Sequence, residues 1–204
     1  MEKKLFAMPG PAFQPALILF REQEQFMDGR FLRNEMLWGA EAQARLAAAH
    51  IIVFGLGGVG SYVVECLARS GVGELTLVDS DTVALSNLNR QLEALGSTVG
   101  QPKAEAVARR IGDINPAAVL HPMQAHYGAE TRELFFPESC HYDYIVDAID
   151  LVSCKLDLAE TARRLGIPLI MALGTGNKQD PSLLRLADIS ETYGCPLARV
   201  MRKE

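Results

Sequence analysis

The sequence predicts an α/β fold of the Rossmann-like, doubly wound type, with a mostly parallel sheet and helices on both faces. Three observations lead to this prediction. Short apolar segments with the composition of buried strands alternate with longer segments of helical periodicity. The strand segments are apolar throughout, as is typical of parallel strands covered on both faces. A glycine-rich turn from Gly55 to Gly60 joins the first strand to the helix that follows it.

The expected elements follow one another in the order that right-handed crossovers require. The glycines of "GVG" end the first crossover helix, because glycine has access to positive φ. Pro102 lies near the first turn of a later helix, and Asn115-Pro116 ends that helix. The expected strands are 50–54, 74–79, 118–123, 142–150, 167–174 and a last one at 183–189, and the expected helices are 28–49, 59–70, the middle of 100–116, and 154–166.

Length and composition indicate one large domain with an appendage. Pro9, Pro11 and Pro15 break any early helix, so residues 1–28 are expected to form an N-terminal appendage and residues 29–204 the domain. The net charge of -5 does not suggest a generic nucleic-acid coat, so a nucleic-acid substrate would need a local basic patch. The four cysteines contain no CxxC pair and no signal peptide is evident, so a cytoplasmic protein with free thiols is expected.

The glycine turn has the spacing of a phosphate-binding loop. Gly55, Gly57 and Gly60 fit GxGxxG between a strand and a helix, where they permit the turn, the approach of backbone amides to phosphate, and close packing of helix on strand. The helix N-terminus adds partial positive charge. Asp79 ends the second strand, where a carboxylate can accept both ribose hydroxyl protons. These features fit a redox dinucleotide site as well as an ATP site.

The following loop favours ATP. "SNLNRQ" places Asn87, Asn89, Arg90 and Gln91 directly after the predicted ribose acid, and Lys103 begins the next helix. A triphosphate needs several cations, whereas the pyrophosphate of a dinucleotide needs fewer. The alternative interpretation is a solvated polar loop without a ligand.

A DxxD motif ends a later strand. Asp147 and Asp150 stand at the carboxyl end of the segment "YDYIVDAID", where open α/β sheets bind ligands. A carboxylate beside phosphates is the usual protein ligand of Mg²⁺, so both acids are candidates for the metal. The alternative is that Asp150 caps the following helix.

The histidines and the last cysteine have simpler interpretations. No pair among the four histidines has metal-ligand spacing, so all are expected to be structural or surface residues; they are His50, His121, His126 and His141. Cys195 lies in "CPLAR" near the end of the chain, and its plain interpretation is a small buried residue.

Taken together, the motifs resemble one superfamily. The run "GLGGVGS…LVDSDTVALSNLNRQ…VGQPKAE…DINP…VDAID" is similar to the ubiquitin-activating enzymes and their bacterial adenylyltransferases. "RFLRNEMLWG", "GTGNKQDPS" and "CPLARVMRKE" look like the tRNA threonylcarbamoyladenosine dehydratase branch. The resemblance covers the chain from about residue 28 to its end, and it implies that residues 29–204 form an ATP-binding, adenylation-type domain that lacks the C-terminal tail of that branch.

The resemblance also implies roles for individual residues. Arg90 and Lys103 match cations that contact the phosphates, Asp150 matches the acid that positions Mg²⁺, and Arg33 matches an arginine that enters the ATP site from the other protomer of a homodimer. These four, Arg33, Arg90, Lys103 and Asp150, are the expected catalytic residues, with Asp147 beside the metal. The expected ATP-binding set is Gly55, Gly57, Gly58, Gly60, Asp79, Asp81, Asn87, Asn89, Arg90, Gln91 and Lys103.

The implied function is ATP-dependent activation of the carboxylate of threonylcarbamoyladenosine in tRNA, followed by cyclisation. One alternative is an adenylyltransferase that activates the C-terminal glycine of a ubiquitin-like sulfur carrier, with a carrier or cysteine-desulfurase-type partner. The other is a nucleotide-binding module without catalysis. The expected tRNA contact is a basic patch formed by Arg163, Arg164, Arg199, Arg202 and Lys203.

Overall fold

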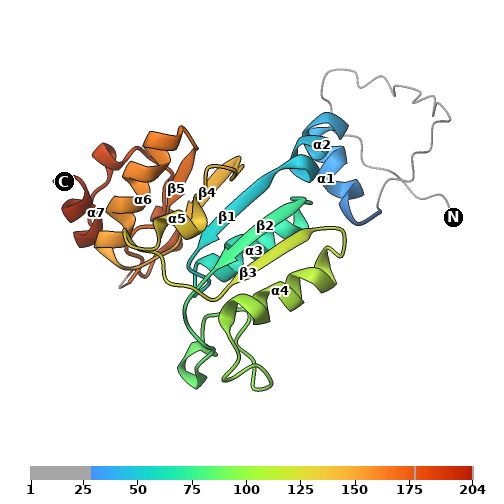
Figure 1. The fold of residues 1–204 in the computed structure, drawn as a ribbon, viewed down its shortest axis with the longest axis horizontal. Helices are drawn as coiled ribbons and strands as arrows, with labels where there is room; N and C mark the ends of the chain where they lie inside the picture. The colour runs from blue at the N-terminus through green and yellow to red at the C-terminus, as the bar shows by residue number, and fades with distance from the viewer. Residues whose placement is uncertain (1–28, 177, 204) are drawn as a thin grey trace, which may run out of the picture.

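The core of the protein is a five-stranded parallel sheet (Figure 1). The structure is a computed structural model that describes residues 29–176 and 178–203, so the appendage predicted for residues 1–28 lies outside it. Each described strand pair is parallel, and the predicted fold class is confirmed. In spatial order the strands are β3 (Val119–Met123), β2 (Glu74–Val78), β1 (His50–Phe54), β4 (Tyr144–Asp147) and β5 (Leu169–Met171).

The strand order reverses at β1. From β1 the chain passes outward to β2 and β3, and it then returns to place β4 on the other side of β1. Phe54 pairs with Val78 on one side and with Asp147 on the other, so the carboxyl ends of three strands lie together. Ligands of open α/β sheets bind outside the carboxyl ends of the strands at such a reversal. The fold therefore positions a site at the ends of β1, β2 and β4.

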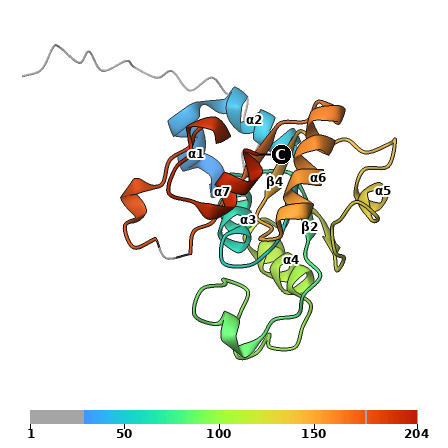
Figure 2. The same ribbon diagram turned by 90° about the vertical axis from the view of Figure 1, so that its left-hand side faces the viewer.

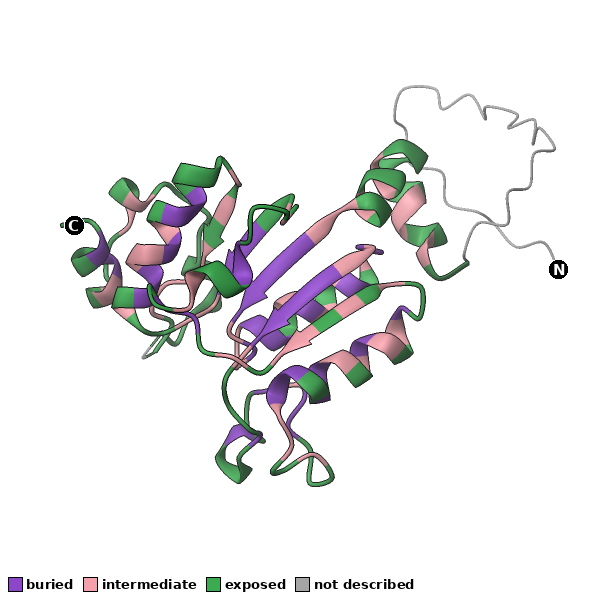
Figure 3. Cartoon of the chain, in the orientation of Figure 1, coloured by how far each residue is buried: buried purple, intermediate pink, exposed green. Residues whose placement is uncertain are grey.

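Helices cover both faces of the sheet (Figure 2). Ile51 and Val53 of β1 enter a core with α3 and α4, whereas Ile52 and Phe54 enter a second core with α5 and α6. Most of β1, β2 and β4 is buried as a result (Figure 3). Among the described helices, none is long and apolar enough to cross a membrane. The helices are α3 (Gly60–Arg69), α4 (Lys103–Ile114), α5 (Arg132–Phe135) and α6 (Val152–Leu165).

The expected first helix is divided in two. After the short 3-10 turn η1 (Gly29–Phe31), α1 (Leu32–Trp38) and α2 (Ala40–Ala48) meet at Gly39, whose φ of 87° only glycine adopts readily. Asn34 Nδ2 donates to the Arg69 carbonyl at 2.8 Å, and Gln43 Nε2 donates to the Ser70 carbonyl at 3.0 Å. The pair therefore docks on the C-terminal end of α3, at the amino end of the sheet.

The prediction of a strand at 183–189 is wrong. This stretch contains exposed residues between two 3-10 turns, η3 (Pro181–Leu183) and η4 (Ile189–Glu191), before the last helix α7 (Pro196–Met201). Asp180 Oδ1 accepts from the Ser182 amide, and Asp188 Oδ1 accepts from the Ser190 amide, each at 2.9 Å. Such local side-chain bonds compete with strand pairing, and the apolar composition of the segment does not reveal them.

Candidate functional site

The glycine loop at the end of β1 allows no larger residue at its two ends. Gly55 has φ 84°, and a Cβ there would stand 2.7 Å from the Ala148 carbonyl oxygen of the loop after β4. A Cβ on Gly60 would stand 1.7 Å from the Gly55 carbonyl oxygen, closer than any non-bonded contact. The chain thus turns back sharply into α3, whose N-terminal amides face the loop.

The middle glycines pack against the predicted polar loop. A Cβ on Gly57 would lie 3.3 Å from Gln91 Nε2, and one on Gly58 would lie 3.2 Å from Arg90 Cγ. Residues separated by about thirty positions in the sequence are therefore in contact. Because these glycines have no side chains, the Arg90–Gln91 segment packs directly on the backbone of the glycine loop.

Asp79 connects the second strand to the glycine loop. Its Oδ2 accepts from the Leu56 amide at 2.7 Å, and its Oδ1 accepts from the Asp81 amide at 2.8 Å. The carboxylate thus stands at the expected end of β2, and in this structure it also fixes the loop. Each carboxylate oxygen has further lone pairs for ribose hydroxyls.

Lys103 reaches the same region through Asp81. Its Nζ lies 2.8 Å from Asp81 Oδ2, and its amide donates to the Asp81 carbonyl at 3.0 Å. The Lys103 side chain is 7% exposed and that of Asp81 is 66% exposed, so the lysine is nearly enclosed while its partner faces solvent. Asp81 therefore positions the cation of Lys103, a role that differs from the expected direct nucleotide contact.

The two asparagines of the polar loop shape it. Asn87, buried at the end of the 3-10 turn η2 (Leu85–Asn87), accepts from the Ala84 amide at 2.8 Å. Asn89 accepts from Arg90 Nη1 at 2.9 Å, and the same Nη1 donates to the Ser86 carbonyl at 3.1 Å. The exposed Arg90 guanidinium retains other N–H donors, because it has five in all.

The two acids of DxxD have different environments. Asp147 is fully buried: its Oδ2 lies 2.9 Å from Lys155 Nζ, and its Oδ1 accepts from the Ile149 amide. Burial raises the pKa of Asp147, against the opposing effect of Lys155. Asp150 is exposed and has no hydrogen bond or ion pair within the described part of the chain, and Leu151, not Asp150, is the N-cap of α6. Of the two predicted magnesium ligands, only Asp150 has a free carboxylate.

Three residues of this region were absent from the expected set. Ser61 Oγ donates to the Gly57 carbonyl at 2.7 Å and accepts from the Leu92 amide at 3.3 Å, so it ties the glycine loop to the polar loop. Lys155 is the buried partner of Asp147. Glu93 is buried, and neither carboxylate oxygen has a hydrogen-bond partner among the described residues. The only sequence signal was for Ser61, which follows Gly60 directly.

Glu93 is an unusual group for a core. Burial raises the pKa of its carboxyl, and the Asp79 charge does the same, while the positive charge of Lys103 opposes them. An unpaired buried carboxylate costs free energy that the neutral form avoids. The Glu93 carboxyl therefore keeps its proton to a higher pH in the folded protein than an exposed glutamate would.

Arg33 does not reach the glycine loop of its own chain. It is an exposed residue of α1, which docks at the C-terminal end of α3, whereas the loop is at the N-terminal end of that helix. Ten residues of α-helix separate the two ends by about 15 Å. Arg90 and Lys103 thus lie in the region of the glycine loop, but Arg33 lies apart from it on α1, which Figure 1 shows beyond the amino end of β1.

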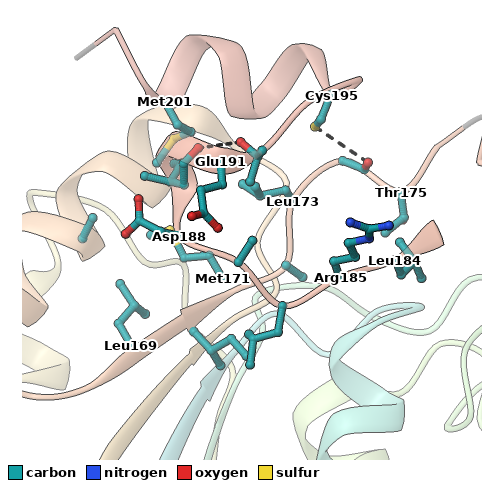
Figure 4. A pocket seen from close by; sticks show the side chains of 18 of the residues that line it. Leu169, Met171, Leu173, Thr175, Leu184, Arg185, Asp188, Glu191, Cys195 and Met201 are labelled. Atoms are coloured by element: carbon teal, nitrogen blue, oxygen red, sulfur yellow. Dashed lines mark hydrogen bonds between the residues drawn. The ribbon is translucent and has the colours of Figure 1, made fainter. Parts of the chain in front are cut away.

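A large pocket lies mostly away from the glycine loop. It has a volume of about 2310 Å³ and lies between β5, α6 and the segment 173–195, and Val59 is the glycine-loop residue that reaches it. Figure 4 shows Leu169, Met171 and Leu184 around this space. Its size exceeds the roughly 300–1,000 Å³ of small-molecule sites. The polar side chains predicted to bind the nucleotide converge at the glycine loop, and Arg90, Lys103 and Asp79 do not line this pocket.

Cys195 caps the last helix. The Ala198 amide donates to its Sγ at 3.4 Å, and the thiol approaches the Gly174 carbonyl at 3.8 Å (Figure 4). Burial would raise the pKa of this thiol, but hydrogen bonds with backbone groups of Ala198, Gly174 and Leu197 lower it on balance. The thiol is partly exposed, not buried as predicted, because Cys195 stands at the N-cap of α7, where its Sγ accepts from the helix backbone.

The predicted basic residues are exposed on adjoining helices. Arg163 and Arg164 belong to the last turn of α6, and Arg199 and Arg202 lie on α7 or at its end. α6 and α7 are in contact. Arg202 Nη1 donates to the Thr192 carbonyl at 2.9 Å, so this arginine also holds the preceding turn.

Comparison with known proteins agrees with these motifs. The model of the ThiF family matches residues 31–204. The tRNA threonylcarbamoyladenosine dehydratase of Bacillus subtilis (strain 168) is 45% identical over 173 residues, which cover 85% of this chain and 67% of that protein. The protein of the same name from Haemophilus influenzae is 41% identical over 81% of this chain and 63% of its own length. The chain thus spans about two thirds of the length of these relatives.

A solved structure extends the similarity to the fold. The tRNA N6-threonylcarbamoyladenosine dehydratase of E. coli, in complex with ATP, superposes with a TM-score of 0.82 at 40% identity, over 85% of this chain and 71% of that one. The region matched by the family model, residues 31–204, includes the sheet, the glycine loop and the polar loop. The chain therefore belongs to the ThiF family, as a relative of its tRNA threonylcarbamoyladenosine dehydratases.

Proposed function

We propose that this chain uses ATP to activate the carboxylate of threonylcarbamoyladenosine in tRNA and then closes the activated group into a cyclic, dehydrated form. The supporting observation is the meeting of the glycine loop with Arg90, Gln91 and the Asp81-held Lys103, in a chain 45% identical to a protein named for this reaction. The solved relative that contains ATP supports ATP as the nucleotide. A cytoplasmic location follows from the proposed tRNA substrate.

The residues at the site fit ATP. Gly57 and Gly58 have no side chains of their own, and Gln91 and Arg90 pack directly against them, so a phosphate bound at this loop would meet backbone amides and the Arg90 side chain together. Arg90 retains donors for the phosphates, and Lys103, held by Asp81, supplies a second cation. Asp79 stands at the end of β2 for the ribose. These contacts would stabilise the negative charge on the phosphate oxygens during transfer.

The site also fits one Mg²⁺. Asp150 provides an exposed carboxylate without a partner in the described structure, at the carboxyl end of β4. We assign the metal to Asp150 alone, because both oxygens of Asp147 are already bonded and its side chain is fully buried. Asp147 instead keeps the β4 loop in place through the Ile149 amide. Magnesium, when bound, offsets phosphate charge and keeps several of its waters.

The proposed chemistry needs no nucleophile from the protein. An oxygen of the tRNA carboxylate bonds to the α-phosphorus of ATP as pyrophosphate leaves, which converts a poor leaving group into a good one. The neighbouring carbamoyl group then attacks the carbonyl carbon, loses a proton, and expels AMP as the ring closes. The elements of one water have passed to ATP, which becomes AMP and pyrophosphate. The protein contributes position and charge.

We also propose that two chains form a homodimer in which Arg33 acts on the partner's site. Its distance from the glycine loop of its own chain supports this arrangement. Around it, α1 exposes Leu32, Met36 and Leu37 by 50, 71 and 78%, and an apolar helix face of this kind suits an isologous contact.

Mass spectrometry of tRNA nucleosides tests the proposed activity. Incubation of the full chain with ATP, Mg²⁺ and tRNA that contains threonylcarbamoyladenosine should lower the mass of that nucleoside by one water. The Asp150→Ala variant and a reaction without ATP serve as controls. An unchanged nucleoside, together with pyrophosphate exchange that depends on an added ubiquitin-like sulfur carrier, would establish the adenylyltransferase alternative. Absence of both reactions, with ATP still bound, would indicate a non-catalytic nucleotide-binding module.

A further inference from the structure

A cluster of metal-ligand side chains lies at the amino end of the sheet, away from the proposed ATP site. His50 begins β1, Glu74 begins β2, and His121 is the middle residue of β3. His50 pairs with Glu74, and His121 pairs with Thr76, two residues further along β2. Because alternate residues of a strand point to the same face, all four side chains project from one face of the sheet. The proposed dehydratase chemistry uses none of them.

The ligand atoms are close enough to share one ion. His121 Nε2 lies 2.7 Å and His50 Nδ1 lies 3.5 Å from the same oxygen, Glu74 Oε1. One ligand atom from each of the three residues lies within 4.8 Å of the other two. Ligands at the usual bond lengths of about 2.0–2.2 Å around a tetrahedral Zn²⁺ stand roughly 3.3 Å apart. Small side-chain rotations therefore suffice to bring the three atoms onto one ion.

The orientation of His50 is already set by its neighbours. Its Nε2 lies 2.9 Å from Thr76 Oγ1, which leaves Nδ1 directed at Glu74. The Tyr142 ring packs edge-on against it, with the ring centroids 4.7 Å apart. A hydrogen bond to the second nitrogen of a metal-binding histidine commonly fixes the ring in this way. With Nε2 bonded to Thr76, the Nδ1 atom of His50 is the one available to a metal ion.

We propose that His50, Glu74 and His121 bind a single divalent transition-metal ion of the zinc class. Two imidazoles and one carboxylate suit Zn²⁺ and its first-row neighbours, whereas Mg²⁺ and Ca²⁺ prefer sites made wholly of oxygen. Side-chain exposures of 19% for His50, 38% for Glu74 and 46% for His121 leave room for water to complete the coordination. The site opens into a pocket of about 670 Å³ that Cys140 and His141 also line.

The site would have a structural effect. An ion bound there ties β1, β2 and β3 together at the end of the sheet where α2 enters β1, and Ala48 of α2 lines the same pocket. Cys140 is not needed as a ligand, because burial raises the pKa of its thiol above the ordinary value and disfavours the thiolate.

Titration of the chelator-treated full chain with Zn²⁺ alone tests the inference. Calorimetry should show one saturable site, and thermal unfolding should shift upward at one equivalent of Zn²⁺. His121→Ala and Glu74→Gln should each weaken binding by at least about tenfold and remove the thermal shift. Cys140→Ser and His126→Ala are the matched controls and should bind as the unaltered chain does. Since His121 and Glu74 are partly exposed, unchanged circular dichroism and ATP binding would confirm that both variants fold.

Two results would overturn the inference. One is the absence of a saturable Zn²⁺ site at one equivalent. The other is binding that persists in His121→Ala and Glu74→Gln but disappears in Cys140→Ser, since the metal would then be held by thiol. Co²⁺ in place of Zn²⁺ gives an independent readout, because the expected nitrogen and oxygen ligands produce no sulfur-to-cobalt charge-transfer band.

Discussion

Lys155 and Asp147 form an ion pair in which the charged atoms are 2.9 Å apart and both side chains have no exposed surface. The pair lies at the end of β4, between the sheet and α6. A buried pair of this kind adds little net stability as a unit, but loss of one partner leaves the other charge unpaired. The conformation of the β4 loop, which contains Asp150, therefore depends on Lys155 of α6.

Lys155→Met should destabilise the protein by about 3–5 kcal/mol, because it leaves the Asp147 carboxylate buried without a cation. Burial already raises the pKa of Asp147, and loss of the cation raises it further. The loss of unfolding free energy should therefore become smaller as the pH falls through the raised pKa of Asp147, since Asp147 then becomes protonated in the folded state as well as in the unfolded state. Urea unfolding at several pH values measures this. The double variant Asp147→Asn/Lys155→Met should recover most of the loss, while Lys203→Met at the exposed end of the chain should change little.

Glu93→Gln should increase the free energy of unfolding at pH 7. Burial raises the folded-state pKa of Glu93 above its ordinary value of 4.5, so the folded state loses stability as the pH rises above that value. Glutamine has no proton to lose, and its advantage should vanish below about pH 4, where glutamate is protonated in both states. Glu105→Gln on the exposed side of α4 is the control. A gain that stays constant from pH 4 to pH 8 would contradict the role assigned to burial.

Gly60→Ala should destabilise the glycine loop by about 1–3 kcal/mol and remove measurable binding of ATP with Mg²⁺, because a Cβ there meets the Gly55 carbonyl oxygen at 1.7 Å. Calorimetric titration and urea unfolding report the two effects. Gly112→Ala on α4 is the matched control, since its nearest neighbour would be Leu120 Cδ1 at 3.9 Å. That control should bind ATP normally and gain about 0.5–1 kcal/mol from helix propensity.

Mixing two inactive variants should restore activity if Arg33 acts across a dimer. The Arg33→Ala chain keeps Asp150, and the Asp150→Ala chain supplies Arg33, so each mixed dimer contains one complete site. Random exchange should return about one quarter of the wild-type sites. Tagged co-purification verifies that exchange has occurred. Mixed dimers without activity would show that Arg33 acts within its own chain, whereas an Arg33→Ala chain that is active alone would show that Arg33 has no catalytic part.

Arg199→Ala combined with Arg202→Ala should weaken tRNA binding and flatten its dependence on salt. Each lost phosphate contact lowers the slope of log K against log salt by about 0.7–0.9. Filter binding across a range of salt concentrations gives the slope, and ATP titration should be unchanged. Arg109→Ala on α4 serves as a control. Because Arg202 also holds the Thr192 carbonyl, thermal unfolding of the variant must be compared. An unchanged slope would exclude this patch as the tRNA contact.

The sequence by itself determined the fold class, the order of strands and helices, and the family. These features depend on local patterns: apolar runs of strand length, helical periodicity, and glycines that permit the turn at residues 55–60. The polar loop and Lys103 were also expected near the glycines, because segments after successive parallel strands meet at one edge of a sheet. Two predictions from such patterns failed: the helix expected at 28–49 is divided into two at Gly39, and the described residues at 183–189 form no strand.

Tertiary structure alone decided which distant side chains meet. The buried partner of Asp147 is eight residues away on a helix, Glu93 is enclosed by segments that are far apart in the chain, and Arg33 is placed at the opposite end of α3 from the glycine loop. His50 and His121 are 71 positions apart, so no local spacing could reveal that strand register gathers both around Glu74. Local propensity acts over a few residues, whereas burial, ion pairing and metal-ligand geometry depend on the packing of the whole sheet.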